Sequence, residues 1–241
     1  MPLDPSVVDV WAFDLLAPDE RAENAYDLLS EDERQRAERF HFPADRRRFG
    51  MARASLRLVL GEYLEVAPKR LAFEYSEYGK PKISWPNTDL RFNASRSHER
   101  ALIACARGRE IGVDIECIRH DLEVDDLAQR FFSVAENQRL RAVPHDVRHL
   151  EFLRCWTCKE AYAKALGKGL SLDPIELDVS VVLNNRATRA GSMEAFVVDD
   201  WALVVLGPDT VDGYAMALAV ERGEFIVKMH PIPSDEQQAG T

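Results

Sequence analysis

The chain has 241 residues, 46% of them hydrophobic, and this length suits one domain or two small halves with a packed core. Its formal net charge of -10 argues against a protein that binds nucleic acid or an anionic membrane surface. Four cysteines are not a disulfide framework in so long a chain, and no apolar run approaches the roughly 20 residues that span a bilayer.

Up to about residue 106, the pattern predicts one strand, three helices and then several short strands. These elements are expected at residues 7–15, 19–29, 31–40, 44–64, 71–75, 83–85, 91–95 and 101–106. Ser30 is followed three residues later by Glu33, which is the pattern of a capping box and predicts where the helix at 31–40 begins.

The second and third of these helices form a basic island. Between residues 30 and 57 the chain has eight arginines and five acids, a local charge of +3, so the remainder carries -13. A basic island on an acidic protein suggests a site for a small anionic ligand. The alternative is a helical surface of alternating charges that faces water.

A polar corner separates the two strands that end this half. Ser95 or Ser97 could serve as a nucleophile beside His98, but neither serine lies in a G-x-S-x-G motif. A better use of the corner is to bind phosphate, because the Arg96 guanidinium can bind it in a bidentate manner. A polar turn without a ligand is the alternative.

The next predicted strand, at residues 111–117, carries two carboxylates on one face. Asp114 and Glu116 are two positions apart, and side chains repeat every two residues along a strand. Their charges repel each other unless they share a hard cation, and such oxygen ligands fit Mg²⁺. For so common a pattern, a solvated edge strand is the alternative.

Three further helices are expected at residues 122–131, 134–143 and 146–166. In the last one, Lys159, Glu160, Lys164 and Lys168 put three cations and one acid within about three turns. That grouping suggests a place for phosphates and a metal. The alternative is an amphipathic helix with a surface Glu–Lys pair.

The remainder is predicted to form an antiparallel sheet with strands at residues 177–183, 195–198, 201–206, 214–220 and 225–227. The spacing from Arg53 to Gly61 recurs from Lys159 to Gly167, which suggests two related halves. We therefore expect an α+β fold, a pseudo-twofold arrangement of two similar halves that each pack a small, mostly antiparallel sheet with a long helix. Their expected limits are 1–106 and 107–230, followed by a polar tail at 231–241.

Five motifs then occur in a telling order. They are Tyr78-Gly-Lys-Pro81, Phe92-Asn-Ala-Ser-Arg-Ser97, Gly112-Val-Asp-Ile-Glu116, Arg130-Phe-Phe132 and Trp156-Thr-Cys-Lys-Glu-Ala-Tyr-Ala-Lys-Ala-Leu-Gly-Lys-Gly-Leu170. Over about residues 7–220 the chain resembles the 4′-phosphopantetheinyl transferases of the surfactin-synthetase-activating type. The resemblance implies a Mg²⁺-dependent enzyme that moves 4′-phosphopantetheine from coenzyme A to a serine of an apo acyl or peptidyl carrier protein, releasing adenosine 3′,5′-bisphosphate.

The resemblance also implies roles for individual residues. The metal ligands would be Asp114, Glu116 and Glu160. The catalytic group would be Asp114, Glu160, as metal ligand or base, and Lys164, which would hold the pyrophosphate. The residues that bind coenzyme A would be Arg48, Lys80, Ser95, Arg96, His98 and Lys164. The basic helix at 31–40 would lie near the same nucleotide.

One position departs from the family pattern, which usually has histidine where Arg96 stands. Arginine still binds phosphate but stays charged and cannot accept a proton. In an extended strand His98 would return to the same face, so we expect Arg96 to grip a phosphate of coenzyme A with His98 close by.

Two other functions remain as alternatives. One is a non-catalytic coenzyme A-binding relative or scaffold, although binding alone would not need the metal-site acids. The other is an acyltransferase that uses acyl-coenzyme A without a metal. The N-terminus has no basic start followed by an apolar stretch, so we expect a cytoplasmic protein, and we expect a monomer.

Overall fold

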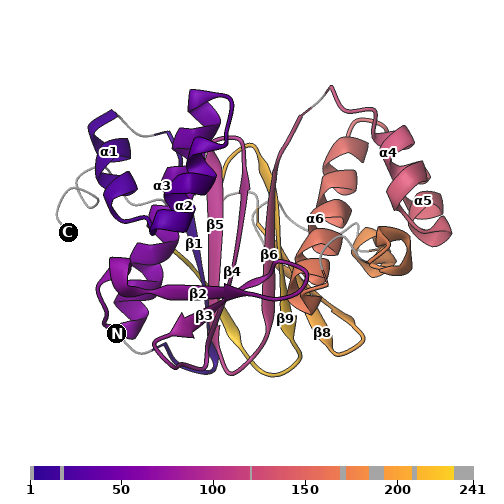
Figure 1. Cartoon of the computed structure of the whole chain (residues 1–241). Helices are drawn as coiled ribbons and strands as arrows, with labels where there is room; N and C mark the ends of the chain where they lie inside the picture. Colours follow the sequence, from indigo (N-terminus) through magenta and orange to yellow (C-terminus); the bar gives the residue numbers. More distant parts are fainter. Residues whose placement is uncertain are drawn as a thin grey trace.

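Two four-stranded sheets lie at the centre of the molecule, with helices α1 to α3 flanking one side and α4 to α6 the other (Figure 1). The structure is a computed structural model, and it describes residues 3–16, 19–119, 121–168, 172–184, 193–207 and 211–230. The tail predicted at 231–241 lies outside these ranges. The expected α+β fold of two similar halves is confirmed.

The first part of the chain supplies three helices and five strands. They are β1 (Val7–Asp14), α1 (Asp19–Asp27), α2 (Glu31–Glu38), α3 (Pro43–Leu64), β2 (Ala72–Tyr75), β3 (Pro81–Trp85), β4 (Leu90–Ser97) and β5 (Arg100–Arg107). The first large sheet has the order β10-β1-β5-β4, and β2 and β3 form a separate hairpin. The long helix α3 packs Leu56, Val59 and Leu60 against this sheet.

The second part follows the same plan. Its elements are β6 (Ile111–Cys117), α4 (Val124–Phe131), α5 (Val134–Arg141), α6 (Arg148–Leu166), β7 (Glu194–Val198), β8 (Trp201–Leu206), β9 (Tyr214–Glu221) and β10 (Ile226–His230). The second sheet is antiparallel, with the order β6-β9-β8-β7. Helix α6 packs on this sheet through buried residues that include Cys158 and Ala161.

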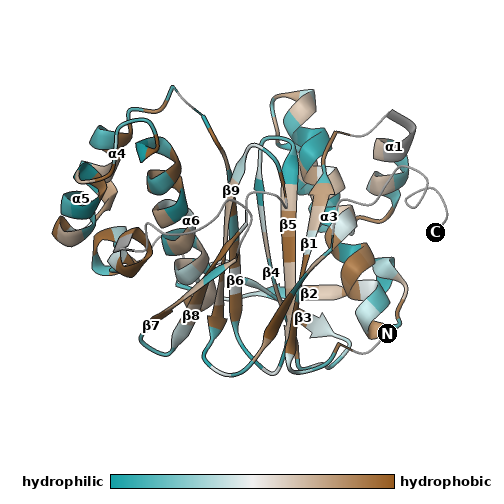
Figure 2. Cartoon of the chain, turned by 180° about the vertical axis from the view of Figure 1, so that it is seen from behind, coloured by the Kyte–Doolittle hydropathy of each residue, from teal (hydrophilic) through white to brown (hydrophobic). Residues whose placement is uncertain are grey.

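The two sheets also share a core. Val8 and Val10 of the first sheet belong to the same buried cluster as Val113, Ile115 and other residues of the second sheet. Figure 2 shows hydrophobic residues along the central strands and hydrophilic colours on the outer helices. The strands where the two sheets meet are therefore surrounded by apolar side chains. A polar side chain buried there needs a hydrogen-bond partner, because it has lost contact with water.

Local sequence explains several helix ends. Ser30 and Glu33 form the predicted capping box at the start of α2. Pro43 occupies the first turn of α3, where a missing N–H costs nothing. Gly167 takes a left-handed conformation with φ 68° and ends α6 directly after Leu166.

Two predictions for the C-terminal sheet were wrong, one about a strand and one about which sheet a strand joins. Residues 177–183 do not form a strand: they follow the 3-10 helix Pro174–Glu176 and run into the 3-10 helix Ser180–Asn184. The Leu177 carbonyl and the Val179 N–H are bound by the side chains of Lys159 and Glu136, so they are not available to a sheet. The predicted strand at 225–227 is part of β10, which pairs in parallel with β1 in the first sheet.

None of the helices within the described residues is both long enough and apolar enough to cross a lipid bilayer.

Candidate active site

The edge strands of the two sheets meet at a polar cluster that also receives a side chain from α6. Lys164 Nζ donates to Ser95 Oγ at 2.8 Å and to Asp114 Oδ1 at 2.5 Å. Ser95 Oγ in turn donates to Asp114 Oδ1 at 2.7 Å. Three predicted site residues from β4, β6 and α6 are thus in direct contact.

The Asp114 carboxylate is only half used by these bonds. Its side chain is buried, and its second oxygen, Oδ2, is buried without a hydrogen-bond partner. A buried acceptor left unsatisfied costs on the order of 1–3 kcal/mol. An atom of this kind in a polar cluster is where a cation would be stabilised, and it is the feature of the structure that best fits a metal ion.

The negative charge of Asp114 affects the pKa of two further acids. Burial, and then the Asp114 charge, raise the pKa of Glu116, while the hydrogen bond from Ser97 lowers it. Burial, and then the Asp114 charge, also raise the pKa of Glu160, and the Lys164 charge opposes them. The three predicted metal ligands are therefore neighbours whose negative charges destabilise one another.

These acids do not form a finished metal cage. Among the described residues, no group of three or more histidine, cysteine, aspartate or glutamate side chains is gathered so as to hold a metal ion. Mg²⁺ commonly takes only one or two protein carboxylates, and water and substrate phosphates complete its shell. Asp114 with one neighbouring carboxylate matches that smaller requirement.

A cationic cavity of about 310 Å³ lies next to the cluster. Ser95 and Lys164 line one part of it, and Arg36, Arg53 and Arg96 are its other polar residues. Its remaining lining residues are Phe49, Ala52, Leu56, Ala94, Ala101 and Ile103. Such a cavity suits a ligand that has both phosphates and a flat or apolar part.

Only part of the basic island is available to a ligand. Arg53 and Arg57 both bind the buried carboxylate of Glu33, and Arg57 also donates to two backbone carbonyls. Arg48 pairs with Asp45 at 3.2 Å. The predicted island is therefore partly structural, and fewer of its eight arginines are available to a ligand than the sequence count suggests.

Arg96 lies against two aromatic rings. Its guanidinium carbon is 5.7 Å from the ring centre of Phe40 and 6.0 Å from that of Phe49. Burial lowers the pKa of Arg96; the nearby charge of Asp45 opposes this, and those of Arg36 and Arg48 add to it. Arg48 therefore lies close enough to Arg96, beside the cavity, for their positive charges to repel each other.

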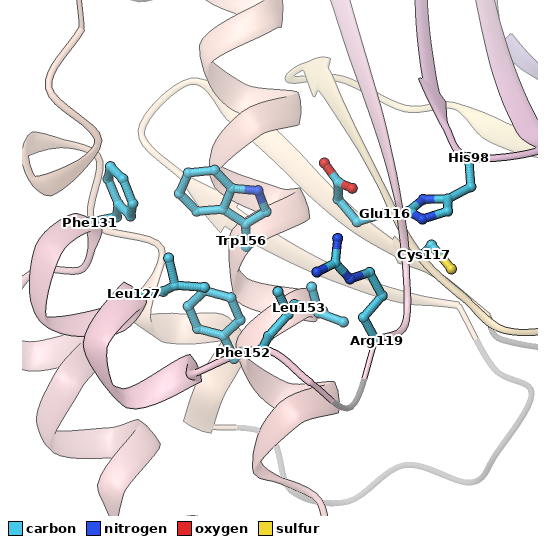
Figure 3. A pocket seen from close by; sticks show the side chains of 10 residues that line it. His98, Glu116, Cys117, Arg119, Leu127, Phe131, Phe152, Leu153 and Trp156 are labelled. Carbon is cyan, nitrogen blue, oxygen red and sulfur yellow. The ribbon is translucent and has the colours of Figure 1, made fainter. Parts of the chain in front are cut away.

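Arg96 and His98, which we expected on one face, line different cavities. Strand β4 ends at Ser97, and His98 adopts φ 49°, so the two-residue alternation stops before it. His98 lines an apolar cavity of about 230 Å³ together with Glu116, Arg119 and others. Figure 3 shows polar side chains from the end of β6 on one side of this cavity and Phe152 and Trp156 of α6 on the other.

Lys80 also lies apart from the polar cluster. Its Nζ donates to Glu110 Oε2 at 2.7 Å, to the Ala165 carbonyl at 2.9 Å and to the Ile111 carbonyl at 3.3 Å. Lys80 therefore fastens the β2–β3 hairpin to the end of α6 and the start of β6.

The sequence grouping of three lysines near a phosphate was wrong for Lys159. Its side chain is 1% exposed and donates to both carboxylate oxygens of Glu136 at 2.7 Å and to the Leu177 carbonyl. This lysine is on the buried side of α6, where it holds α5 and the following turn.

Sequence reasoning missed Asn93, Glu136 and one cavity, and it considered Ser97 only as a nucleophile or phosphate-binding group and not as a link between strands. Asn93 and Ser97 link β4 to β6, and Glu136 is the partner of Lys159. Asn93 and Ser97 alternate with Ser95, and this spacing could have indicated a shared face. Nothing local marks Glu136 as a partner, because it is 23 residues from Lys159. The apolar cavity combines residues of β6, α4 and α6 with residues of the loops beside them.

Two family models match the chain. The model described as the 4′-phosphopantetheinyl transferase superfamily matches residues 110–219. A second model, described as 4′-phosphopantetheinyl transferase, N-terminal, matches residues 17–108. The second match contains α3 with strands β4 and β5 of the first sheet, and the first match contains α6 with the strands of the second sheet up to residue 219.

Individual proteins are also similar over most of the chain. The 4′-phosphopantetheinyl transferase HetI of Nostoc sp. is 38% identical over 216 residues, which is 88% of this chain and 87% of that protein. The 4′-phosphopantetheinyl transferase Sfp of Bacillus subtilis is 30% identical over 209 residues, 86% of this chain and 88% of that protein. The L-aminoadipate-semialdehyde dehydrogenase-phosphopantetheinyl transferase of Xenopus laevis is 30% identical over 165 residues, 63% of this chain and 54% of that protein.

Proposed function

Because the chain belongs to the 4′-phosphopantetheinyl transferase superfamily, we propose that it moves 4′-phosphopantetheine from coenzyme A to a serine of an apo acyl or peptidyl carrier protein. The carrier serine oxygen forms a bond to the phosphorus that bears pantetheine. The bond from that phosphorus to the bridging pyrophosphate oxygen breaks, and adenosine 3′,5′-bisphosphate leaves with the electron pair. The proton of the serine hydroxyl passes to a base.

The observation that carries this proposal is the cluster of Ser95, Asp114 and Lys164 where the two sheets meet. Negative charge grows on the leaving bisphosphate, and Lys164 stabilises it as a fixed cation beside the cationic cavity. Ser95 holds both Lys164 and Asp114 in place through its hydroxyl. Glu160 accepts the serine proton directly or through water, or binds the metal, and its raised pKa suits a base.

We further propose that Mg²⁺ binds at this cluster. Asp114, through its unpartnered Oδ2, and Glu116 or Glu160 are the residues that would hold it. When bound, the ion supplies charge neutralisation on the pyrophosphate. It would also relieve the repulsion from Asp114 that, after burial, raises the pKa values of Glu116 and Glu160.

The nucleotide part of coenzyme A is assigned to the cationic cavity. Arg96 there takes the place of the usual histidine and binds a phosphate; Arg36 lines the same cavity and the charge of Arg48 acts on Arg96. Phe40 and Phe49 hold the Arg96 guanidinium through ring contacts. For Lys80 to contact the same nucleotide, it must leave its ion pair with Glu110, so we assign it a supporting part.

Neither alternative function has an observation in its favour. A scaffold would not require the buried Asp114–Lys164 pair beside an unpartnered carboxylate oxygen. An acyltransferase without a metal would leave that oxygen unexplained. We further propose that the enzyme is cytoplasmic and that it is a monomer. Light scattering on the purified protein, which measures its molar mass, tests the second point.

The direct test is to incubate the protein with coenzyme A, MgCl₂ and a panel of apo-carrier proteins and to measure the intact mass of each carrier. The proposal expects one carrier or more to gain the mass of phosphopantetheine, and expects EDTA to stop the gain. A gain that persists in EDTA contradicts the metal assignment. No gain on any carrier contradicts the activity.

A further inference from the structure

The seam between the sheets, defined here as the facing edges of β4 and β6, is joined by side chains. Strand β4 ends the first sheet and β6 ends the second, and the two lie side by side (Figure 1). Residues at alternate positions of β4 face β6: Asn93, Ser95 and Ser97. An open strand edge presents N–H groups that need partners, and Asn93 and Ser97 supply acceptors for two of those on β6.

The three links of the seam differ in what they hold. Asn93 Oδ1 accepts the Val113 N–H at 2.9 Å, which is a purely structural bond to backbone. Ser95 belongs to the Asp114–Lys164 cluster. Ser97 Oγ accepts the Cys117 N–H at 3.2 Å and donates to Glu116 Oε2 at 2.9 Å. Only Ser97 therefore joins a fixed backbone group to a carboxylate of the proposed metal site.

The direction of these bonds is forced. A hydroxyl has one proton and two lone pairs, and a backbone N–H can only donate. Because Cys117 N–H takes a lone pair of Ser97, the single proton of Ser97 is free to point at Glu116. The serine is thus oriented by the backbone of β6 and, in turn, orients the carboxylate on the same strand.

The carboxylate has a reason to move without this bond. Asp114 on the same face of β6 carries a negative charge, as Glu116 does. Glu116 also lines the apolar cavity together with Arg119. Repulsion from Asp114 favours side-chain conformations of Glu116 that point away from the cluster. The bond from Ser97 opposes that movement and keeps the two acids on one site.

We infer that Ser97 is a positioning residue that holds the Glu116 carboxylate beside Asp114 for metal binding. The inference rests on the proposed function, since it assigns a second layer to the proposed Mg²⁺ site. Partners that orient a metal ligand in this way commonly contribute about 10–100-fold to metal affinity. Ser97 itself contacts neither the metal nor the reacting atoms.

The test measures Mn²⁺ binding by electron paramagnetic resonance in saturating coenzyme A without a carrier, so that no turnover occurs. Ser97→Ala is expected to weaken Mn²⁺ binding by about tenfold. Ser97→Thr keeps the hydroxyl and is expected to stay within about twofold of the wild type. Ser97→Val has the shape of threonine without the hydroxyl, and it is expected to behave like Ser97→Ala.

Kinetics and stability provide the second readout. For Ser97→Ala, the Mg²⁺ concentration that gives half-maximal kcat should rise about tenfold, with the KM for coenzyme A changed by less than about twofold. Asn93→Ala is the matched control, because it removes a seam link that touches no carboxylate. It should lower the unfolding midpoint and leave the Mn²⁺ affinity of the folded protein unchanged.

Mn²⁺ affinity equal to wild type in both Ser97→Ala and Ser97→Val overturns the inference. Equal loss in Asn93→Ala and Ser97→Ala also overturns it, because the seam would then act only by holding the sheets together. Glu116→Ala distinguishes the proposed role of Ser97 from the proposed role of Glu116 as a metal ligand. If Glu116→Ala loses Mn²⁺ binding and Ser97→Ala does not, the inference alone fails. If Glu116→Ala binds Mn²⁺ as the wild type does, Glu116 is not a ligand, Asp114 and Glu160 remain as the proposed ligands, and the inference fails.

Discussion

Lys159 and Lys164 are five positions apart on α6, and burial gives them different tasks. Lys159 is enclosed with Glu136, whereas Lys164 is partly exposed and reaches the seam. A sequence pattern identifies both as cations on one helix. It could not tell them apart, because the partner of each is remote in the chain, 23 residues away for Lys159 and 50 for Lys164.

This contrast predicts opposite outcomes for one substitution. Lys159→Met leaves the Glu136 charge buried without its partner, and should cost on the order of 3–5 kcal/mol in the free energy of unfolding. Lys164→Met should alter the unfolding free energy far less and lower the transfer rate by about 100-fold or more. Denaturant unfolding and the carrier mass assay measure the two effects. Equal loss of stability in the two variants contradicts the separation.

Arg96 stands where the resemblance to the family leads us to expect histidine, and its proposed role is to bind a phosphate of coenzyme A. Arg96→Ala should raise the KM for coenzyme A by about tenfold with a smaller change in kcat, because it removes a contact to a part of the substrate that does not react. Arg96→His should recover part of the loss. Arg46→Ala removes an exposed arginine of the same basic island and serves as the control. An Arg96→Ala enzyme with unchanged steady-state constants rules out the phosphate contact.

Between strand β6 and helix α6, the contact depends on one glycine. A Cβ atom built on Gly112 would lie 2.0 Å from the Ala161 carbonyl oxygen and 2.5 Å from the Ala165 nitrogen. Backbone atoms cannot yield as a side-chain tip does, so the helix itself would have to move. Lys164 comes from that segment of α6 and Asp114 from that segment of β6.

Gly112→Ala should therefore affect stability and activity together. Overpacking costs about 1–3 kcal/mol and occasionally more, and a collision with two backbone atoms belongs at the upper end. Separation of α6 from β6 also lengthens the contact of Lys164 with Asp114, so kcat should fall. Thermal unfolding and the transfer rate check both expectations. A Gly112→Ala protein with a wild-type midpoint means that this close approach is not maintained in solution.

Helix α2 is attached to α3 through Glu33. Burial by itself raises the pKa of this carboxyl, but the hydrogen bond from Arg57 and the charge of Arg53 outweigh it and lower the pKa. A lowered folded pKa gives stability that is present above the unfolded pKa, near 4.5, and is lost as the pH falls through the folded value. The ion pair thus stabilises the protein at neutral pH.

Glu33→Gln should make this linkage visible. At pH 7 the variant leaves Arg57 buried without its carboxylate and should lose on the order of 3–5 kcal/mol. The difference from the wild type should shrink as the pH falls from about 4.5 towards the lowered folded pKa, because the wild-type carboxyl then gains a proton in the unfolded state before it does so in the folded state. Urea unfolding at a series of pH values checks this. A difference that stays constant down to pH 3 disagrees with the lowered pKa.

At the level of elements, the hydrophobic periodicity of the sequence predicted the strands and helices whose own apolar residues form a buried face. Residues 177–183 look like a strand because they are apolar, yet their backbone is bound by the Glu136–Lys159 pair. The hydrophobic pattern reports that a segment is buried. It does not report which polar groups take its backbone hydrogen bonds.

Over the whole molecule, sequence predicted two similar halves and most of the polar cluster, but not how the halves are joined. Strand β10 returns to the first sheet, where His230 bonds Asp9 at 2.9 Å and stacks on Trp11. The Asn93 and Ser97 links of the seam join the sheets at the other edge. Such contacts connect residues distant in sequence, so local patterns contain no record of them.

We propose that phosphopantetheine transfer takes place at the Ser95–Asp114–Lys164 cluster. The decisive measurement is the initial rate at which an apo-carrier gains phosphopantetheine mass with the wild type, Asp114→Asn and Lys164→Met. We expect transfer by the wild type and rates lower by about 100-fold or more in both variants, with the folded state of Lys164→Met retained. Transfer at the wild-type rate by either variant, or no transfer by the wild type to any carrier, would contradict it.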